Sequence, residues 1–254
     1  MVRAVLADLH LGQAPGDLER FAVTVAEVQA RGVGEVVFLG DLFRTLVGFS
    51  RFWDQSVEAG LAQLARLRTA GARVVMVEGN RDFFLDAAEL AAYRDGWGMA
   101  HSFTAGGRRF LLEHGDLVNR HDRAYRWWRS LSKSAASRLW ARSLPAALAR
   151  SIVHRTEARL AQTNFSYRRE VPEEDLGAAA RRHFAAGVDV VLWGHFHRPW
   201  QLKWGEKEAH VLGGWCETGT VVTVGEDGTL VFSNVDENGH FVDTAGSSWY
   251  QGRE

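Results

Sequence analysis

Metal-binding side chains recur at the ends of apolar segments along most of this chain. Five segments of strand-like composition each give way to Asp, Asn or His, often directly after a glycine. In α/β sheets the carboxyl ends of strands border the ligand crevice, so these side chains are expected to converge there. The five sites are Asp8-Leu-His10, Gly40-Asp41, Gly79-Asn80-Arg81-Asp82, His114-Gly-Asp116 and Gly194-His195-Phe-His197.

The types of these side chains indicate a two-metal centre. Two Asp, one Asn and four His are about what two six-coordinate ions need when they share a bridging carboxylate and also bind water. Mixed imidazole and carboxylate ligands suit Mn, Fe or Zn better than Ca, and the lack of Cys ligands argues against a structural zinc site. Two such ions activate water and clamp the attacking and leaving oxygens at phosphorus. We therefore predict hydrolysis of a phosphate ester or anhydride.

The elements that must position these residues alternate between strand and helix. Buried strands are predicted at residues 3–7, 35–39 and 73–77, with helices at 17–31 and 54–70 between them. This βαβαβ order is typical of a largely parallel sheet covered by helices. Further strands, the last four antiparallel, are expected at 109–113, 188–193, 200–204, 209–213, 220–224 and 229–233.

Length and composition exclude several classes of protein. A chain of 254 residues with 46% hydrophobic and 24% charged residues is globular, with one large domain or two small ones. Its one cysteine, Cys216, cannot form an internal disulfide, and nothing suggests an oxidising compartment. We find neither a signal-peptide segment nor an apolar run near the ~20 residues of a membrane span. A cytoplasmic location is expected.

The net charge of −1 conceals a basic segment. Residues 119–169 hold twelve Lys and Arg against two acids, a local charge of +10, while the remainder carries −11. One interpretation is a solvated helical hairpin whose Trp side chains join the core. The other is a cap whose arginines contact an anionic ligand or lipid while its aromatic face binds an apolar group. Apolar residues recur at helical spacing on either side of a helix-start residue, Pro145: Trp127, Trp128, Leu131, Trp140, Leu144, Leu148 and Ile152.

The ordered series of motifs resembles the signature of the calcineurin-like metallophosphoesterases. The resemblance implies an α/β fold, a two-sheet αββα sandwich, with residues 1–118 and 170–254 as the core and a basic helical cap inserted at 119–169. It implies two divalent ions, Mn in the first place, with Fe, Zn or Mg as alternatives. The implied ligands are Asp8, His10, Asp41 and His197 for one ion and Asp41, Asn80, His114 and His195 for the other, with Asp41 bridging.

Finer features are similar to one branch, the UDP-2,3-diacylglucosamine diphosphatases of lipid A synthesis. They include Gly79-Asn-Arg-Asp-Phe83, Gly194-His-x-His-Arg-Pro199 and Val211-Leu-Gly-Gly-Trp215. Arg81 stands where the wider family usually has His, and its guanidinium suits a pyrophosphate. The branch implies that water bound between the metals attacks the α-phosphorus of an acylated nucleotide sugar, giving UMP and 2,3-diacylglucosamine 1-phosphate. The implied substrate contacts are Asn80, Arg81, Asp122, Asn164 and His195, of which Asn80, Arg81 and His195 also serve catalysis.

Departures from that branch lie around the expected pocket. Arg44 and Leu46 replace residues of a loop that commonly reads Glu, then Trp and Gly-Asp-Asp. Leu160 and Tyr167 stand where a serine and a lysine are expected. These changes leave the metal chemistry untouched but bear on the substrate. A metal-dependent phosphodiesterase or pyrophosphatase acting on another nucleotide conjugate is therefore the alternative.

The basic cap indicates the partners. Its charge of +10 suits both a pyrophosphate and the anionic inner-membrane surface, so peripheral association with that membrane is expected. A nucleic-acid backbone would also suit this charge, but the Trp and Leu spacing and the acidic remainder favour lipid, and no nucleic-acid partner is expected. A non-catalytic scaffold on this fold should have lost metal ligands, and none is missing here.

Overall fold

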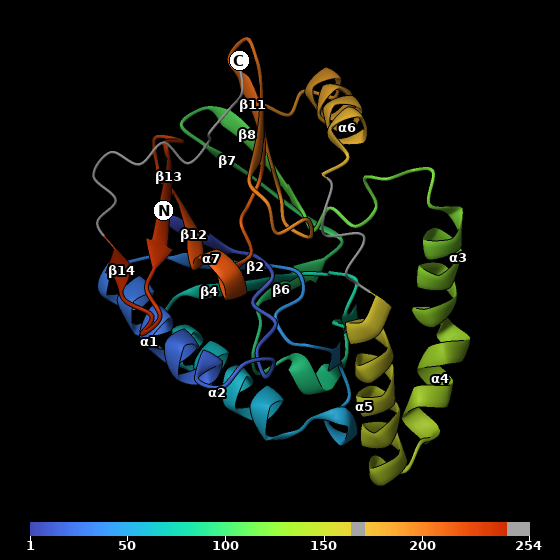
Figure 1. Cartoon of the computed structure of the whole chain (residues 1–254). Coiled ribbons are helices and arrows are strands. Elements are labelled where there is room, and N and C mark those ends of the chain that lie inside the picture. Colours follow the sequence, from blue (N-terminus) through green and yellow to red (C-terminus); the bar gives the residue numbers. More distant parts are fainter. Residues whose placement is uncertain (164–170, 243–254) are drawn as a thin grey trace.

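Two β-sheets lie face to face in this chain, with helices on their outer faces (Figure 1). The computed structural model describes residues 1–163 and 171–242, and the side chains in these ranges except those of 154 and 156–163. Helices α1 (Asp17–Ala30) and α2 (Gln55–Thr69) cover the first sheet, and α6 (Glu173–Ala185) covers the second. The predicted αββα sandwich is confirmed.

The first sheet has the strand order β14-β13-β12-β1-β2-β4-β6. Its strands β1, β2, β4 and β6 are parallel, as the βαβαβ pattern predicted, and β12 to β14 extend it antiparallel. The bounds are β1 Arg3–Leu6, β2 Glu35–Leu39, β4 Arg73–Val77, β6 Gly96–Gly98, β12 Thr220–Val224, β13 Leu230–Val235 and β14 Phe241–Val242.

The second sheet has the order β10-β11-β9-β8-β7, in which β8, β9 and β11 are parallel. The four late strands pair antiparallel as expected, β10 with β11 and β12 with β13, but the sequence did not predict that β9 has a parallel partner in β11. Its hairpin with β10 reverses the chain once more, so that β11 runs in the same direction as β9. The bounds are β7 Ala100–Ala105, β8 Arg108–Glu113, β9 Val190–Trp193, β10 Trp200–Trp204 and β11 Lys207–Val211.

Both faces of the central strands are buried. In β1, Leu6 packs toward α1 and α2, whereas Val5 packs toward the second sheet. In β9, Leu192 lies between the sheets and Trp193 packs against α6. Strands covered on both faces need apolar residues throughout, which explains the unbroken apolar runs of the sequence.

Short elements complete the body at its loops. Strands β3 and β5 pair in parallel as a separate ribbon close to the ends of β2 and β4. The bounds are β3 Leu46–Val47, β5 Asp82–Phe83, the 3₁₀ turns η1 Ser50–Phe52 and η2 Ala88–Leu90, and the single helical turn α7 Trp215–Thr218.

Three helices from the basic segment stand at one side of the sandwich: α3 (Arg123–Ser132), α4 (Ala135–Ser143) and α5 (Ala146–Thr163) (Figure 1). The four-residue apolar spacing that begins at Trp140 does not form one helix. Helix α4 ends before Pro145, because proline disfavours helical backbone in the residue preceding it. Within the described residues, no helix has the length and apolar character to cross a bilayer.

The interpretation that placed the cap tryptophans in the core is wrong. Trp127 is 68% exposed and Trp140 54%, whereas the small or aliphatic residues Ala141, Leu144 and Ala149 join the core cluster beneath α1 and α2. The cap helices therefore attach through their aliphatic residues and turn their tryptophans outward.

Candidate functional site

Side chains from the ends of β1, β2, β4, β8 and β9 meet at one edge of the sandwich. His10 and His197 face each other with their Nε2 atoms 3.2 Å apart. Asn80 Oδ1 lies 3.0 Å from both His114 Nε2 and His195 Nδ1. These five predicted ligands come from four different strand ends, so only the folded chain brings them together.

The two aspartates join these groups into one cluster. Asp8 Oδ1 lies 3.5 Å from His197 Nε2, and Asp41 Oδ1 lies 3.8 Å from His114 Nε2. One ligand atom each from Asp8, Asp41 and His114 falls within 4.8 Å of the others. Asp41 thus lies close to both Asp8 and His114, and the resemblance gives it the role of the bridging ligand.

The backbone is strained at most of the predicted ligands. A positive φ is costly for residues other than glycine, and it persists only where the surroundings impose it. Among the described non-glycine residues, the positive φ values are Asp8 53°, His10 49°, Asp41 51°, Phe84 59°, His195 70° and His197 57°. Five of these six are predicted metal ligands, so the strain is concentrated where the side chains must converge.

The glycines beside the ligands make room for other ligand side chains. A Cβ atom would lie 2.2 Å from His114 Nδ1 at Gly40, 2.3 Å from Asp41 Oδ1 at Gly79 and 2.7 Å from Asp8 Oδ2 at Gly194. We attributed these glycines to a sharp exit of the backbone, but only Gly40, with φ +83°, has a conformation that favours glycine. At the other two positions the requirement is space.

The donor set fits divalent cations. Asp8 Oδ1 is fully buried and accepts no hydrogen bond from the described residues, although it lies beside the imidazole of His197. A buried carboxylate oxygen without a donor is costly unless a cation completes it. Burial and the neighbouring His114 lower the pKa of His195 to about 4, which leaves its ring neutral and able to offer a lone pair. Carboxylate oxygens, an amide oxygen and imidazole nitrogens together suit Mn, Fe or Zn.

Arg81 lies against the central carboxylate. Its backbone N–H donates to Asp41 Oδ1 at 2.8 Å, and its Nε is 3.6 Å from Asp41 Oδ2. Burial would raise the pKa of Asp41, but His114, His10 and Arg81 outweigh burial and lower it to about 2. Asp41 is therefore ionised at neutral pH, with a guanidinium beside it that can meet a phosphoryl group.

Two acidic residues of the motifs brace the site and do not join the ligand cluster. Asp82 Oδ2 accepts from the backbone N–H groups of Gly79 and Asp41, at 2.8 and 2.9 Å, and so ties the ends of β2 and β4 together. Asp116 accepts from the Tyr125 hydroxyl and pairs with Arg129 Nε at 3.0 Å. Asp116 therefore anchors α3 to the end of β8.

Helix α3 also rests directly on the ligand-bearing loop after β4. Lys133 Nζ donates to Gly79 O at 2.8 Å and to Glu78 Oε1 at 2.9 Å. The ring of Trp128 meets Phe83 edge to face at 6.2 Å. The sequence did not distinguish Lys133 from the other basic residues of the cap, because only the fold shows which of them faces the site.

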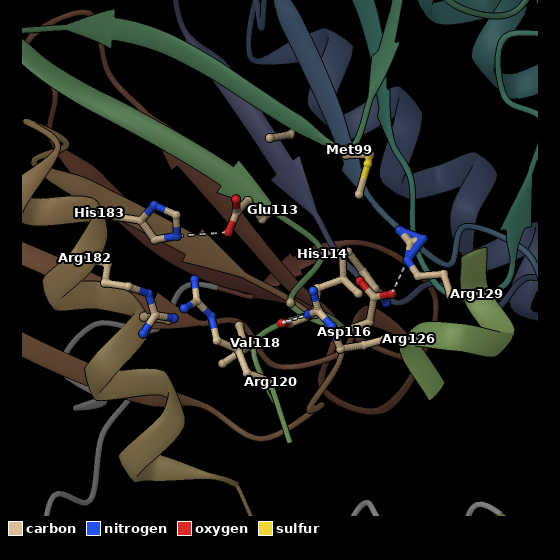
Figure 2. Close-up of a pocket in the computed structure, with 14 residues that line it drawn as sticks. Met99, Glu113, His114, Asp116, Val118, Arg120, Arg126, Arg129, Arg182 and His183 are labelled. Carbon is tan, nitrogen blue, oxygen red and sulfur yellow. Dashed lines mark hydrogen bonds and ion pairs between the residues drawn. The ribbon is translucent and has the colours of Figure 1, made fainter. Parts of the chain in front are cut away.

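A cavity of about 270 Å³ opens beside His114 (Figure 2). Arg120, Arg126 and Arg182 line it from the loop after β8, from α3 and from α6, and no ion pair joins any of the three to another described residue. Glu113, also in the wall, is paired with His183 at 3.2 Å. The cavity therefore carries uncompensated positive charge next to the ligand cluster.

The remaining residues that the sequence placed around the substrate either contact groups other than the predicted metal ligands or lie outside the described residues. Asp122 Oδ1 accepts from the backbone N–H of Tyr125 at 2.8 Å and caps α3. Arg44, from the departing loop, offers its carbonyl to Arg81 Nη1 at 3.3 Å, and Leu46 is buried in β3. Asn164, Tyr167 and the side chain of Leu160 lie outside the described residues, so these three expectations stay predictions.

Sequence reasoning missed two residues next to the cluster. Glu217 holds His197 Nδ1 with both carboxylate oxygens at 2.7 Å, and Cys216 groups with His10 and His197 as possible ligands. Both follow β11, whose end carries Gly213-Gly214, so the pattern of glycine after an apolar strand could have revealed them.

Comparisons with known proteins agree with this geometry. Residues 1–199 match the family model of the calcineurin-like phosphoesterases. A UDP-2,3-diacylglucosamine hydrolase of Stenotrophomonas maltophilia is 30% identical over 247 residues, covering 90% of this chain and 96% of the relative. A protein of the same name from Xanthomonas campestris pv. campestris is 29% identical over 245 residues, covering 90% and 97%.

Among solved structures, a dimetal phosphatase from Danio rerio covers 91% of this chain and 98% of its own, with 18% identity and a TM-score of 0.47. The match to the family model extends over more than three quarters of the sequence and includes every predicted metal ligand. The chain therefore belongs to the calcineurin-like phosphoesterases, and it is a hydrolase of phosphoester or phosphoanhydride bonds.

Proposed function

We propose that the protein hydrolyses the pyrophosphate of UDP-2,3-diacylglucosamine to UMP and 2,3-diacylglucosamine 1-phosphate. The relatives that match over nine tenths of the chain bear the name of this substrate. One observation carries the proposal: an arginine-lined cavity and an exposed apolar helix face border the same ligand cluster. A nucleotide carrying acyl chains has the same division into an anionic half and an apolar half.

Seven residues would hold two divalent ions. Asp8, His10, Asp41 and His197 would bind one, and Asp41, Asn80, His114 and His195 the other, with Mn as the proposed metal and Fe, Zn or Mg as alternatives. Such ions supply Lewis acidity toward a phosphate and lower the pKa of water. Five converging strand ends that place these donors within contact distance support this assignment.

The chain's own groups would orient the substrate at phosphorus. Arg81, held against Asp41, would neutralise charge on the phosphoryl oxygens at the point of bond cleavage. Neutral His195 and the amide of Asn80, which contact each other at 3.0 Å, would fix the α-phosphorus in position for water to attack it. The α-phosphate then stays with uridine as UMP, and the β-phosphate leaves with the lipid.

We assign the nucleotide half to the cavity beside His114. Guanidinium groups bind phosphate and the carbonyl oxygens of a base, and they stack on planar rings. Arg120, Arg126 and Arg182 present such groups from three separate elements (Figure 2). The cavity adjoins the ligand cluster through His114 itself, so a uridine there would bring its phosphate to the metal ligands.

The acyl half would lie along the cap of residues 119–169. Trp127, Trp128 and Leu131 of α3 are 68%, 40% and 51% exposed, and Trp128 contacts Phe83 in the ligand-bearing loop. Covering this surface with acyl chains would remove apolar area from water, which favours binding. The basic residues of the same cap support a peripheral location at the anionic inner-membrane surface.

Release of UMP from acylated and non-acylated substrates tests the proposal. We expect cleavage of UDP-2,3-diacylglucosamine at least about 100-fold more efficient than that of UDP-N-acetylglucosamine, because burial of each acyl methylene contributes about 0.8 kcal/mol. Trp128→Ser should reduce this preference, while Trp204→Ser, which removes a tryptophan of similar exposure on β10, should not. Equal efficiencies for the two substrates would favour another nucleotide conjugate.

A further inference from the structure

The single cysteine of the chain lies beside one half of the proposed metal centre. Cys216 Sγ, His10 and His197 each offer one ligand atom, and the three atoms all lie within 4.8 Å of one another. Cys216 belongs to the helical turn α7, which follows β11 and lies apart from the cap helices α3 to α5 (Figure 1). The sequence motifs that define the metal ligands do not include it.

The backbone fixes Cys216 next to two of those ligands. Trp215 N donates to Ala7 O at 2.9 Å, and Cys216 N donates to Asp8 O at 3.3 Å, so the turn is bound to the end of β1. Cys216 is therefore attached directly to the segment that carries Asp8 and His10. This position depends on backbone hydrogen bonds and does not rely on a flexible loop.

A second observation supports the binding of a cation at this corner of the proposed centre. Asp8 is fully buried, and its Oδ1 accepts no hydrogen bond from the described residues while lying 3.5 Å from His197 Nε2. The Nε2 atoms of His10 and His197 face each other at 3.2 Å. The buried carboxylate oxygen of Asp8 therefore lies beside His197, one of the two imidazoles that group with the sulfur.

Glu217 contacts both His197 and Cys216. Its carboxylate accepts the hydrogen of His197 Nδ1 at 2.7 Å, which directs Nε2 of that ring toward the centre. It also accepts the Cys216 S–H at 2.8 Å. A Cβ on Gly214 would lie 2.4 Å from Glu217 Oε2 and 2.9 Å from His197 Nδ1, so this glycine permits the close approach.

We propose that Cys216 supplies a thiolate ligand to the metal position formed by Asp8, His10 and His197. The inference rests on the proposed metal centre, and it revises our expectation that no cysteine takes part. A sulfur–metal bond forms as the S–H bond breaks, and the proton leaves to solvent. Because thiolate favours softer ions, Cys216 should shift the preference of this one position from Mn²⁺, the metal proposed above, toward Zn²⁺, Fe²⁺ or Co²⁺. The position formed by Asn80, His114 and His195 has no sulfur.

Cobalt substitution tests this ligand without substrate. The full chain is freed of metal with a chelator, loaded with two equivalents of Co²⁺ under reducing conditions, and its absorption spectrum is recorded. We expect a near-ultraviolet band from sulfur-to-cobalt charge transfer in the wild type. The band should be absent from Cys216→Ser, which keeps a hydroxyl for Glu217 and should keep the visible bands of bound cobalt. Cys216 is the sole cysteine, so no other thiolate can produce the band.

A metal competition provides a second readout. Cys216→Ser should lower the affinity for Zn²⁺ relative to Mn²⁺ at one of the two positions by about tenfold or more, the range that follows loss of groups supporting a metal. A wild type that binds two Co²⁺ without the band, or a variant that retains it, would overturn the thiolate ligand and leave the proposed reaction intact. Presence of the band without release of UMP would contradict only the proposed reaction.

Discussion

Two clusters of charged and polar residues lie at opposite ends of the same parallel strands, and they are built differently. At the amino ends, the buried Glu35 of β2 meets Arg3, Arg73 and His101. Its Oε1 lies 3.0 Å from Arg3 Nε and 3.1 Å from His101 Nε2, and its Oε2 pairs with Arg73. Both carboxylate oxygens are satisfied within the chain.

The cluster at the carboxyl ends is left incomplete by the protein alone. Asp8 Oδ1 accepts no hydrogen bond from the described residues, and five of the seven predicted ligands have positive φ. Strained backbone and an unsatisfied buried oxygen both cost stability, and such features concentrate at functional sites. The comparison teaches that a charge cluster whose groups are all paired stabilises the fold, whereas a cluster with a buried, unsatisfied oxygen and strained backbone is typical of a ligand-binding site.

The largest expected effect comes from removing the central carboxylate of the open cluster. Asp41→Ala should lower hydrolysis by about 10³-fold or more, because the proposed bridging ligand and its electrostatic role are lost. Metal content, measured by mass spectrometry, should fall below two ions per chain. The metal-free variant should remain folded, with a melting temperature moderately below that of the metal-free wild type, because the favourable pairing of Asp41 with His114, His10 and Arg81 is lost. A strongly destabilised metal-free variant would show that the cluster is structural.

A single methyl group next to the same carboxylate should have a smaller effect. Gly79→Ala places a Cβ 2.3 Å from Asp41 Oδ1, so the carboxylate must shift. A misplacement of about 1 Å at a reacting centre can lower the rate by about 10²-fold. Gly177→Ala in α6 is the matched control, because its nearest neighbour is a flexible arginine 3.5 Å away. That variant should keep full activity and gain up to about 1 kcal/mol of stability. Equal losses of activity in both variants would contradict the steric explanation.

In the paired cluster, Glu35→Gln should reduce stability and leave activity within about twofold of wild type. Burial opposes ionisation of Glu35, but His101 and Arg73 outweigh it and lower its pKa from 4.5 to about 2. The ionised form thus stabilises the fold above pH 4.5, by about 2–3 kcal/mol. This contribution is lost as the pH falls toward 2. Denaturant titrations at pH 7 and pH 3 should show the difference between wild type and variant shrinking. A difference independent of pH would refute the role of the charge.

The smallest effect is expected in the arginine-lined cavity. Arg182→Gln should raise KM for the nucleotide substrate by about tenfold while kcat changes little, since a charge-assisted hydrogen bond contributes about 1.5 kcal/mol. Arg181→Gln is the control, because Arg181 lies on the same helix but stacks on Trp204, outside the cavity. Steady-state kinetics of both variants test the assignment of the nucleotide half. An unchanged KM in Arg182→Gln would remove the cavity from substrate binding.

The sequence predicted the strand ends well because three of the five combine two local signals. A buried apolar run specifies a strand, and a glycine followed by Asp, Asn or His specifies where it ends, as at Gly40-Asp41 and Gly194-His195. Both signals lie within a few residues, so no tertiary information is needed. The ligand cluster of the structure contains all seven ligands that were predicted at these strand ends.

Roles that depend on long-range contacts could not be predicted from local patterns. Asp82 and Asp116 have the residue type of ligands, yet one binds backbone N–H groups and the other anchors α3. Residue type alone does not distinguish these uses. Likewise, helical spacing showed that Trp127 and Trp128 share an apolar face, but it did not show whether that face meets the core or solvent. The position of Cys216 depended on a sixth strand end and on a turn attached to β1.

The spread of the ligands along the chain has a consequence for folding. The first predicted ligand is Asp8 and the last is His197, so nearly the whole α/β body must form before all seven donors exist together. Metal ions would then bind the native state and not the unfolded chain, and by mass action they would stabilise the fold. The melting temperature of this protein should therefore rise with the concentration of free divalent metal and report directly on how fully the centre is loaded.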